Sequence, residues 1–335
     1  MKPTTLSVHV SHFLNHYLAS QRNLSPNTIK AYRDVFVLLL RFCRDSKGGA
    51  VERLELQQID VALVDAFLDY LTQERRCSDR TVNQRLAVLH AFFRYLQVEE
   101  PSLIQQCQRI LAIPLRRFVR HEVGYLPKEL LAALLAQPDL DRSDGRRDAV
   151  LLSVLYDTGA RVQELIDLTA GDVRLEAPAQ VRILGKGRKV RVVPLMDNTT
   201  GFLQQYFDES NLALPENYSR SLFLNRQGNA LTRVGVNYIL QKHLQQVREA
   251  HPEFTQTVSP HTLRHTKAMH LVQGGVSLDI VRDFLGHVDI KTTELYARAN
   301  LEMKRAAIEK VSPTPTPDIP SWKANKSLLQ WLQGL

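Results

Sequence analysis

The residues with the clearest chemical potential lie in one short segment of the chain. His261 and Arg264 are three residues apart, and Tyr296 comes nine residues after His287. Ser259-Pro260 predicts a helix start directly before His261, because serine is a good N-cap and proline fits the first turn. Helix N-termini attract anions through unpaired N–H groups. The segment therefore indicates cationic and hydrogen-bonding groups gathered around one anion, with a tyrosine hydroxyl beside it.

Each of these residues also has an ordinary interpretation. A single histidine is most often a core or surface residue, and Tyr296 alone would be a packing aromatic. His261 and His265 have the i, i+4 spacing of zinc-binding helices, but no glutamate follows His261 and no third ligand is apparent. We therefore predict no metal and no cofactor, and we assign His265 a structural role.

The elements that must position this segment are mainly helices. Residues 148–156 read as one helix that Gly159 ends, and a short helix with Arg161 follows. The period then changes, because apolar residues alternate with arginines on both sides of the sequence GKGRK. This alternation predicts a β-hairpin whose turn contains Lys186. The chain is expected to be mostly helical from there to about Val311.

The N-terminal third reads as a bundle of four or five helices. Apolar residues recur at helical spacing from Leu6 to Leu18, and Ser25-Pro26 predicts the start of a second helix. Asp60 can cap a third helix, Ser78 or Asp79 a fourth, and a short helix is expected after Pro101. Basic residues flank this bundle.

Composition limits the classes of function. The 335 residues suffice for two domains, and the net charge of +8 favours a polyanionic partner. Residues 1–120 contain 17 Lys and Arg against 11 Asp and Glu, so most of the excess lies there. Three separated cysteines indicate free thiols in a reducing compartment. We found no signal peptide and no transmembrane stretch, and we expect a cytoplasmic, nucleoid-associated bacterial protein without a membrane partner.

Four motifs resemble those of the tyrosine recombinases, or phage integrase family. HTLRH followed by LGHVDIKTTELYAR is similar to the active-site segment of that family. DTGARVQELIDLTAGDV resembles its first-arginine motif, and ILGKGRKVRVVPL resembles its lysine-bearing hairpin. LSPNTIKAYRDVFVLLLRF is similar to the start of its helical core-binding domain. The resemblance covers about residues 5–305, and every position of the active-site set has its usual residue type.

The resemblance implies a role for each of six residues. Tyr296 would be the nucleophile, and Lys186 would protonate the leaving 5′-oxygen. Arginines donate paired N–H bonds to phosphate oxygens, so Arg161 and Arg264 would stabilise the transition state. His261 would be the base or a phosphate hydrogen-bond donor, and His287 would contact the scissile phosphate and position Tyr296.

The same resemblance implies a fold and a domain order. The fold is expected to be mainly α, with an N-terminal SAM-like core-binding bundle and an α+β catalytic domain containing a small antiparallel sheet. We place the bundle at 1–112, an interdomain linker at 113–126 and the catalytic domain at 127–311. Residues 312–335 would form a Pro-Thr spacer and a terminal helix that docks on a neighbouring protomer or on its own domain.

The predicted function is site-specific recombination of double-stranded DNA. Strands would be cleaved and rejoined through a 3′-phosphotyrosine link and a Holliday junction, by a dimer at each site and a tetramer in synapsis. Partner recombinases and accessory DNA-bending proteins are possible additions. We expect integration, excision or transposition of a mobile element. The alternatives are Xer-like resolution of chromosome or plasmid multimers, a type IB topoisomerase, and a DNA-binding regulator without catalytic activity.

Overall fold

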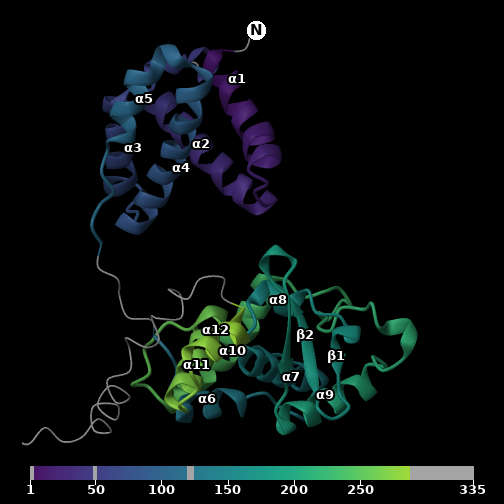
Figure 1. Cartoon of the computed structure of the whole chain (residues 1–335). Helices are drawn as coiled ribbons and strands as arrows, with labels where there is room; N and C mark the ends of the chain where they lie inside the picture. The colour runs from purple at the N-terminus through teal and green to yellow at the C-terminus, as the bar shows by residue number, and fades with distance from the viewer. Residues whose placement is uncertain (1–3, 48–50, 119–123, 287–335) are drawn as a thin grey trace, which may run out of the picture. The chain divides into compact units, whose positions relative to one another are not determined.

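A computed structural model describes residues 4–47, 51–118 and 124–286 of the chain. The chain divides into two compact units, Met1–His121 and Glu122–Leu335, which are shown in Figure 1 and described separately. The expected mainly helical fold with a small antiparallel sheet is confirmed. No helix in the described ranges is long and apolar enough to cross a membrane.

The first unit is entirely helical in its described residues. Side chains cap four of its helices at their N-terminal ends, where Thr4, Ser25, Asp60 and Ser78 accept hydrogen bonds from backbone N–H groups. Its elements are α1 (Thr5–His12), η1 (Phe13–Gln21), α2 (Pro26–Lys47), η2 (Val51–Arg53), η3 (Leu56–Gln58), α3 (Val61–Gln73), α4 (Asp79–Glu99), η4 (Pro101–Leu103) and α5 (Ile104–Leu111). The expected helix over Leu6–Leu18 differs in detail, because it changes from α to π geometry at Phe13.

Aromatic rings form the centre of the first unit. Phe13 and Phe36 lie within 5.2 Å and 5.0 Å of Phe92, measured between ring centroids, in edge-to-face arrangements. Tyr95 packs against Phe13 in the same group of rings, and its hydroxyl group lies 2.8 Å from His12 Nδ1, at hydrogen-bonding distance. Edge-to-face pairs align positive ring edges with negative faces, so these contacts specify how the helices pack.

The second unit combines a small sheet with helices, and one face of the sheet packs on the unit's interior (Figure 1). Its helices are α6 (Lys128–Leu135), α7 (Ser143–Thr158), α8 (Val162–Ile166), α9 (Asp197–Glu209), α10 (Arg233–Ala250), α11 (Pro260–Gln273) and α12 (Leu278–Leu285), with 3-10 turns η5 (Ala170–Asp172), η6 (Lys186–Arg188) and η7 (Pro215–Asn217). Ser259 caps α11 as expected, by accepting a hydrogen bond from the Thr262 N–H.

The sheet contains the expected hairpin and one additional strand. Strands β1 (Val173–Arg174), β2 (Gln180–Leu184) and β3 (Val190–Pro194) are antiparallel and lie in that order. β1 is only two residues long, and two residues are too few for an alternating pattern to be recognised in sequence. β3 buries an unexpected face, because Val190 and Val192 are 53% and 54% exposed while Arg191 lies on the inner side.

Two glycines in the left-handed conformation end the helices that approach the centre of this unit. Gly159 (φ +54°) ends α7, and Gly286 (φ +63°) ends α12, as the sequence predicts. A Cβ on Gly159 would lie 2.8 Å from Cδ2 of Leu285. The ends of α7 and α12 therefore contact one another, and a larger residue at position 159 would separate them.

The two ends of the segment predicted to be a linker contact different units. Arg116 belongs to the first unit, where its N–H donates to Asn83 Oδ1 at 2.8 Å and its Nη1 donates to Thr72 Oγ1 at 2.6 Å. Leu126 belongs to the second unit, where its N–H donates to Thr266 Oγ1 at 3.0 Å. Within the described residues, Arg116 therefore lies with the first unit and Leu126 with the second.

Candidate functional site

A buried carboxylate, Glu164 on α8, organises the predicted site. Its Oε1 accepts a 2.6 Å hydrogen bond from Arg161 Nη1, and its Oε2 accepts one of 2.9 Å from the Arg161 backbone N–H. Arg191 Nη2 donates to the same Oε2 at 2.7 Å, and Arg264 Nη1 lies 4.0 Å from it. Three guanidinium groups therefore face one carboxylate, and these four side chains keep a net charge of +2.

The cations around Glu164 keep it ionised. Burial opposes ionisation, but hydrogen bonds from Arg191 and from the backbone and side chain of Arg161 outweigh it and lower the pKa of Glu164 to about 2. The carboxylate therefore stays charged across the physiological range and can hold its arginine partners in fixed positions.

The two predicted catalytic arginines differ in exposure. The Arg161 side chain is 33% exposed, so an anion can reach its guanidinium group. Arg264 is 3% exposed, and it donates to the carbonyl oxygens of Gly159 and Leu285, each at 2.6 Å. These carbonyls end α7 and α12, where the helix dipole favours a cation. Arg264 thus joins two helix ends and places a buried positive charge within 4.0 Å of the carboxylate that also binds Arg161.

His261 lies in the first turn of α11, one turn before Arg264. Although the residue is exposed to solvent, nearby protein desolvates its charged form, and Arg264 and Arg161 repel it. Together these effects lower the pKa of His261 below its ordinary value. The ring is therefore neutral at pH 7 and can accept a proton.

His265 and Lys267 support the site from within the unit. Desolvation, with repulsion from His261 and Arg264, lowers the pKa of His265 to about 4. Lys267 Nζ lies 3.6 Å from Asp157 Oδ1 and 4.7 Å from the centroid of the Tyr156 ring. Both residues belong to α11, shortly after the buried Arg264, and the structural role of His265 stays a prediction.

Of the remaining predicted site residues, only the backbone of Lys186 lies within the part of the chain that the structure describes. Lys186 begins the turn η6 directly after Gly185, whose N–H donates to the Lys189 carbonyl at 2.8 Å. A Cβ on Gly185 would lie 3.6 Å from Glu164 Oε1, so the backbone before Lys186 adjoins the Glu164 cluster. His287 and Tyr296 lie outside the described residues, and their roles stay predictions.

Sequence reasoning missed two residues of this cluster, Glu164 and Arg191. Each left a signal in the sequence. Glu164 is at the third position of its helix, where an acidic side chain can reach back to the N-cap N–H. Arg191 is a charged residue within an apolar strand, and such a residue requires a partner wherever it is buried.

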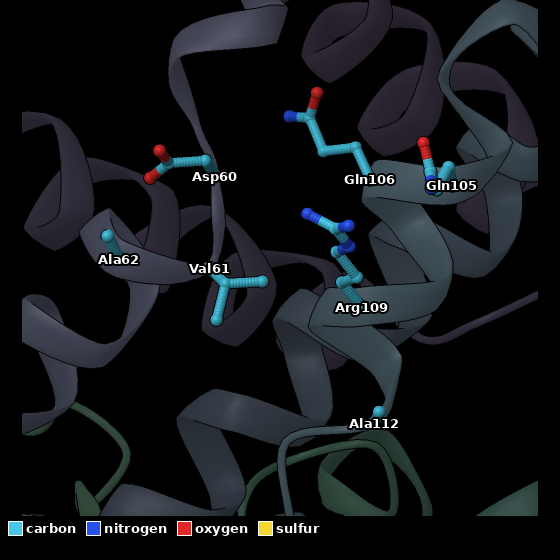
Figure 2. Close-up of a pocket in the computed structure, with 7 residues that line it drawn as sticks. All are labelled: Asp60, Val61, Ala62, Gln105, Gln106, Arg109 and Ala112. Atoms are coloured by element: carbon cyan, nitrogen blue, oxygen red, sulfur yellow. The ribbon is translucent and has the colours of Figure 1, made fainter.

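Two further groups of polar residues lie outside this cluster. Figure 2 shows a pocket of about 670 Å³ in the first unit, between the start of α3 and α5. Its polar side chains mostly serve the fold, since Asp60 caps α3 and Gln106 donates to the carbonyls of Leu56 and Ile59.

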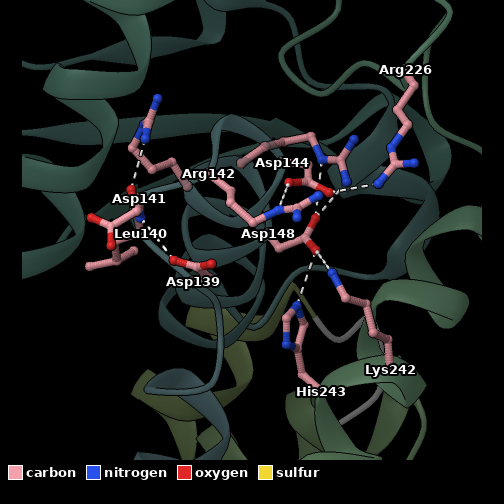
Figure 3. A network of polar contacts seen from close by, with 11 residues as sticks. Asp139, Leu140, Asp141, Arg142, Asp144, Asp148, Arg226, Lys242 and His243 are labelled. Atoms are coloured by element: carbon pink, nitrogen blue, oxygen red, sulfur yellow. Dashed lines mark hydrogen bonds and ion pairs between the residues drawn. The ribbon is translucent and has the colours of Figure 1, made fainter.

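The second group is a charge network at the start of α7, shown in Figure 3. Asp148 is buried and pairs with Arg147, Lys242 and His243, at 2.6, 3.3 and 3.0 Å. Burial opposes ionisation of Asp148, but the hydrogen bonds from His243 and Arg147 and the charges of Arg147 and Lys242 lower its pKa. The network links α10 to α7, and its charged groups neutralise one another.

Sequence comparison matches both units to described families. The profile described as "Phage integrase family" matches residues 125–303, and "Phage integrase, N-terminal SAM-like domain" matches residues 11–100. The "Putative integrase/recombinase y4rC" of Sinorhizobium fredii is 39% identical over 93% of this chain and 93% of its own length. "Tyrosine recombinase XerC" of Pelobacter propionicus is 31% identical over 90% of this chain and 95% of its own.

Solved structures share the fold. An integrase of transposon Tn1549, in complex with circular intermediate DNA, matches with a TM-score of 0.67 and 20% identity, covering 90% of this chain and 99% of that one. The XerH site-specific recombinase, bound to palindromic difH substrate in a post-cleavage complex, matches with a TM-score of 0.65 and 22% identity, covering 86% and 81%.

Proposed function

Because the chain belongs to the phage integrase family of tyrosine recombinases, we propose that it recombines specific DNA sites through a covalent link at Tyr296. The observation that carries this proposal is the convergence of Arg161 and Arg264 on Glu164, with His261 one helical turn before Arg264 on α11. An open cluster with a net charge of +2 suits a phosphodiester, and a neutral histidine at its edge suits proton transfer.

The reaction conserves the energy of the phosphodiester bond. The Tyr296 oxygen attacks phosphorus, the P–O5′ bond breaks, and the 3′-phosphate becomes linked to tyrosine. Arg161 donates to the non-bridging oxygens, and Arg264 places a second positive charge near them from inside the domain. Attack by a 5′-hydroxyl of another strand reverses these bonds, so the exchange needs no ATP.

Two protons must move during cleavage. A tyrosine has a pKa near 10, so Tyr296 must lose its proton as it attacks. His261 accepts it, and the lowered pKa of this histidine keeps it in the neutral form that can do so. Lys186 protonates the leaving 5′-oxygen, and His287 contacts the scissile phosphate.

The DNA is held by both units. The bundle at 1–112 would bind core DNA and the domain at 127–311 would perform cleavage, joined by residues 113–126. The integrase and XerH neighbours were solved with DNA, which supports a duplex partner for this chain. A dimer would occupy each site, and two dimers would form a tetramer that passes through a Holliday junction. Such a protein would act in the bacterial cytoplasm, at the nucleoid.

The C-terminal segment would couple assembly to cleavage. The sequence SPTPTPDIP favours an extended spacer, and the residues after it favour a short apolar helix that docks on a neighbouring protomer. Deletion of 312–335 should leave binding to one half-site intact and weaken cooperative binding to the full site. Unchanged cooperativity in a gel-shift titration would contradict docking in trans.

A mobile element is the proposed biological context. The relative from Sinorhizobium fredii, named a putative integrase/recombinase, aligns over 93% of each chain. Xer-like resolution of chromosome or plasmid multimers is the second candidate, because XerC relatives align over similar lengths at 31–34% identity. Mapping Tyr296–DNA adducts on DNA that flanks the gene would separate these two roles.

The chemistry is tested with a nicked substrate that traps the covalent intermediate. The wild-type protein should form a covalent adduct with its cognate site in the presence of a metal chelator and in the absence of ATP. The Tyr296→Phe variant should bind the same DNA but form no adduct. An adduct formed by Tyr296→Phe would contradict the proposal. Relaxation of any supercoiled DNA without a second site would favour the topoisomerase, and binding without cleavage would favour the regulator.

A further inference from the structure

We propose that Arg191 is a positioning residue for the cleavage step. Arg191 forms an ion pair with Glu164, which also binds Arg161. This pair would fix the positions of the turn that carries Lys186 and of Gly286, the end of α12, relative to Arg161. This inference rests on the proposed function, because it concerns the proton that Lys186 supplies. Arg191 itself need not contact the DNA.

The placement of Arg191 is unusual for an arginine in a strand. It is paired with Ile183 of β2, and it points inward with a side chain that is 11% exposed. Its neighbours Val190 and Val192 point outward. Burying Val190 and Val192 would remove more apolar area from water and so stabilise the strand. The observed strand instead turns the charged Arg191 inward and leaves these two valines exposed.

The side chain of Arg191 lies close to two glycines, Gly185 and Gly286. A Cβ on Gly286 would lie 3.3 Å from both Cδ and Nη1 of Arg191, and a Cβ on Gly185 would lie 3.5 Å from Nη1. Gly185 directly precedes Lys186, and Gly286 directly precedes His287. The Arg191–Glu164 pair therefore lies between the backbone leading to the predicted lysine and that leading to the predicted histidine.

The pair is better explained by positioning than by stability. Arg191 Nε is buried and makes no hydrogen bond to any described residue. Burying an ion pair seldom stabilises a fold more than well-packed apolar residues would, and an unsatisfied N–H reduces the gain further. The planar fork of arginine can hold a carboxylate at one edge while its stem packs on Gly286, whereas the single ammonium group of lysine cannot make both contacts.

Misplacement of the Lys186 turn should produce a defect in leaving-group protonation. An alkoxide leaves poorly unless it is protonated, and general-acid catalysis contributes about 100- to 10,000-fold. A thiolate leaves without a proton, because thiols have a pKa of about 8.5. Replacing the bridging 5′-oxygen by sulfur should therefore restore cleavage to variants that lack the acid, but not to variants that lack charge stabilisation.

The experiment measures single-turnover formation of the covalent adduct on two nicked substrates, one with bridging oxygen and one with bridging sulfur. Arg191→Met should lose on the order of 100-fold with oxygen and return to within about 10-fold of wild type with sulfur. Lys186→Ala should behave in the same way, and Arg161→Ala should be slow with both substrates. Arg191→Lys, which keeps the charge without the fork, should show a smaller defect with the same rescue.

Three measurements keep the outcome interpretable. DNA affinity and thermal melting show whether each variant is folded, and Arg182→Met on the exposed side of β2 provides a matched arginine control in the same hairpin. The inference would be overturned if Arg191→Met cleaved at the wild-type rate. It would also be overturned if Arg191→Met and Arg191→Lys each lost as much activity with the sulfur substrate as with the oxygen substrate. If the wild-type protein forms the adduct but the sulfur substrate does not rescue Lys186→Ala, the inference is overturned. The proposed recombinase function is unaffected by that result.

Discussion

The two units bury different kinds of side chain. In the first, the described core is almost wholly apolar and aromatic, and its buried polar residues are Asn83 and His90. In the second, the interior also contains ionised or ionisable side chains, namely Asp148, Asp157, Glu164, His243, Arg264 and His270. Apolar side chains fill most of both interiors, so the two units differ in the charged groups that the second one adds.

Under the proposed function, this contrast would correspond to a division between DNA binding and catalysis. Buried ion pairs contribute little net stability, because desolvation offsets their attraction, but breaking one leaves a charge without its partner. Under the proposed function, the charged interior of the second unit would hold cations around a phosphate. The first unit, as a proposed DNA-binding bundle, would need only a rigid surface, which apolar packing can provide without buried charges.

The largest expected effect comes from Glu164→Ala. Arg161 and Arg191 would lose their shared carboxylate, which should cost about 3–5 kcal/mol in the second unit and slow cleavage by roughly 100-fold or more. Hydrogen exchange would report the stability of each unit separately, and adduct formation would report the rate. Glu176→Ala, at an exposed pair with Arg174, is the control; equal behaviour of the two variants would refute the organising role.

Phe92→Ala should disrupt the first unit to a similar extent without affecting the chemistry. The ring is 1% exposed and packs against Phe13 and Phe36, so its loss should cost about 3–5 kcal/mol. Hydrogen exchange should increase in α4 and stay unchanged in α7. Val98→Ala, at an exposed position of α4, should change neither helix. Faster exchange throughout α7 would show that the two cores are not independent.

Acidification should destabilise the second unit by a smaller amount. Because the pKa of His265 is lowered to about 4 from 6.5, the unfolded chain binds a proton first as pH falls. The stabilising contribution is complete above pH 6.5 and is lost as pH falls toward 4, with about 1 to 2 kcal/mol lost at pH 5. His265→Asn should flatten this dependence in pH-resolved hydrogen exchange. An unchanged slope would assign the loss to other groups.

The smallest effect is expected for Arg226→Ala. Its side chain is 78% exposed and pairs with Asp144 at 2.8 Å, so solvent and salt screen the interaction. The change in melting stability should stay within about 0.5 kcal/mol. A loss of several kcal/mol would mean that surface pairs of this unit matter as much as its buried ones.

The sequence was informative where structure depends on near neighbours. Ser78 and Ser259 cap their helices, and Gly159 and Gly286 end theirs in the left-handed conformation, as predicted. The π-helical continuation of α1 and the strand β1 were not foreseen. Neither leaves a repeating pattern, because one is a small change in hydrogen-bond spacing and the other is two residues long.

The partners of the charged residues were less accessible from sequence. Glu164 was assigned only to a short helix, and Arg191 only to a strand. Their 2.7 Å contact joins residues 27 positions apart, and Arg264 reaches the Gly159 carbonyl across 105 positions. Nothing in the local pattern specifies such pairs, since any acidic group at the right place would satisfy the same arginine.

The sequence by itself determined the family, the order of the elements and the residues with catalytic potential, because caps, turns and motif spacing depend on contacts within a few residues. Only the tertiary structure decided that β3 buries Arg191 rather than Val190 and Val192, and that three guanidinium groups face one carboxylate. Those outcomes depend on long-range packing, in which a buried charge is tolerated only where distant segments bring its partner to it.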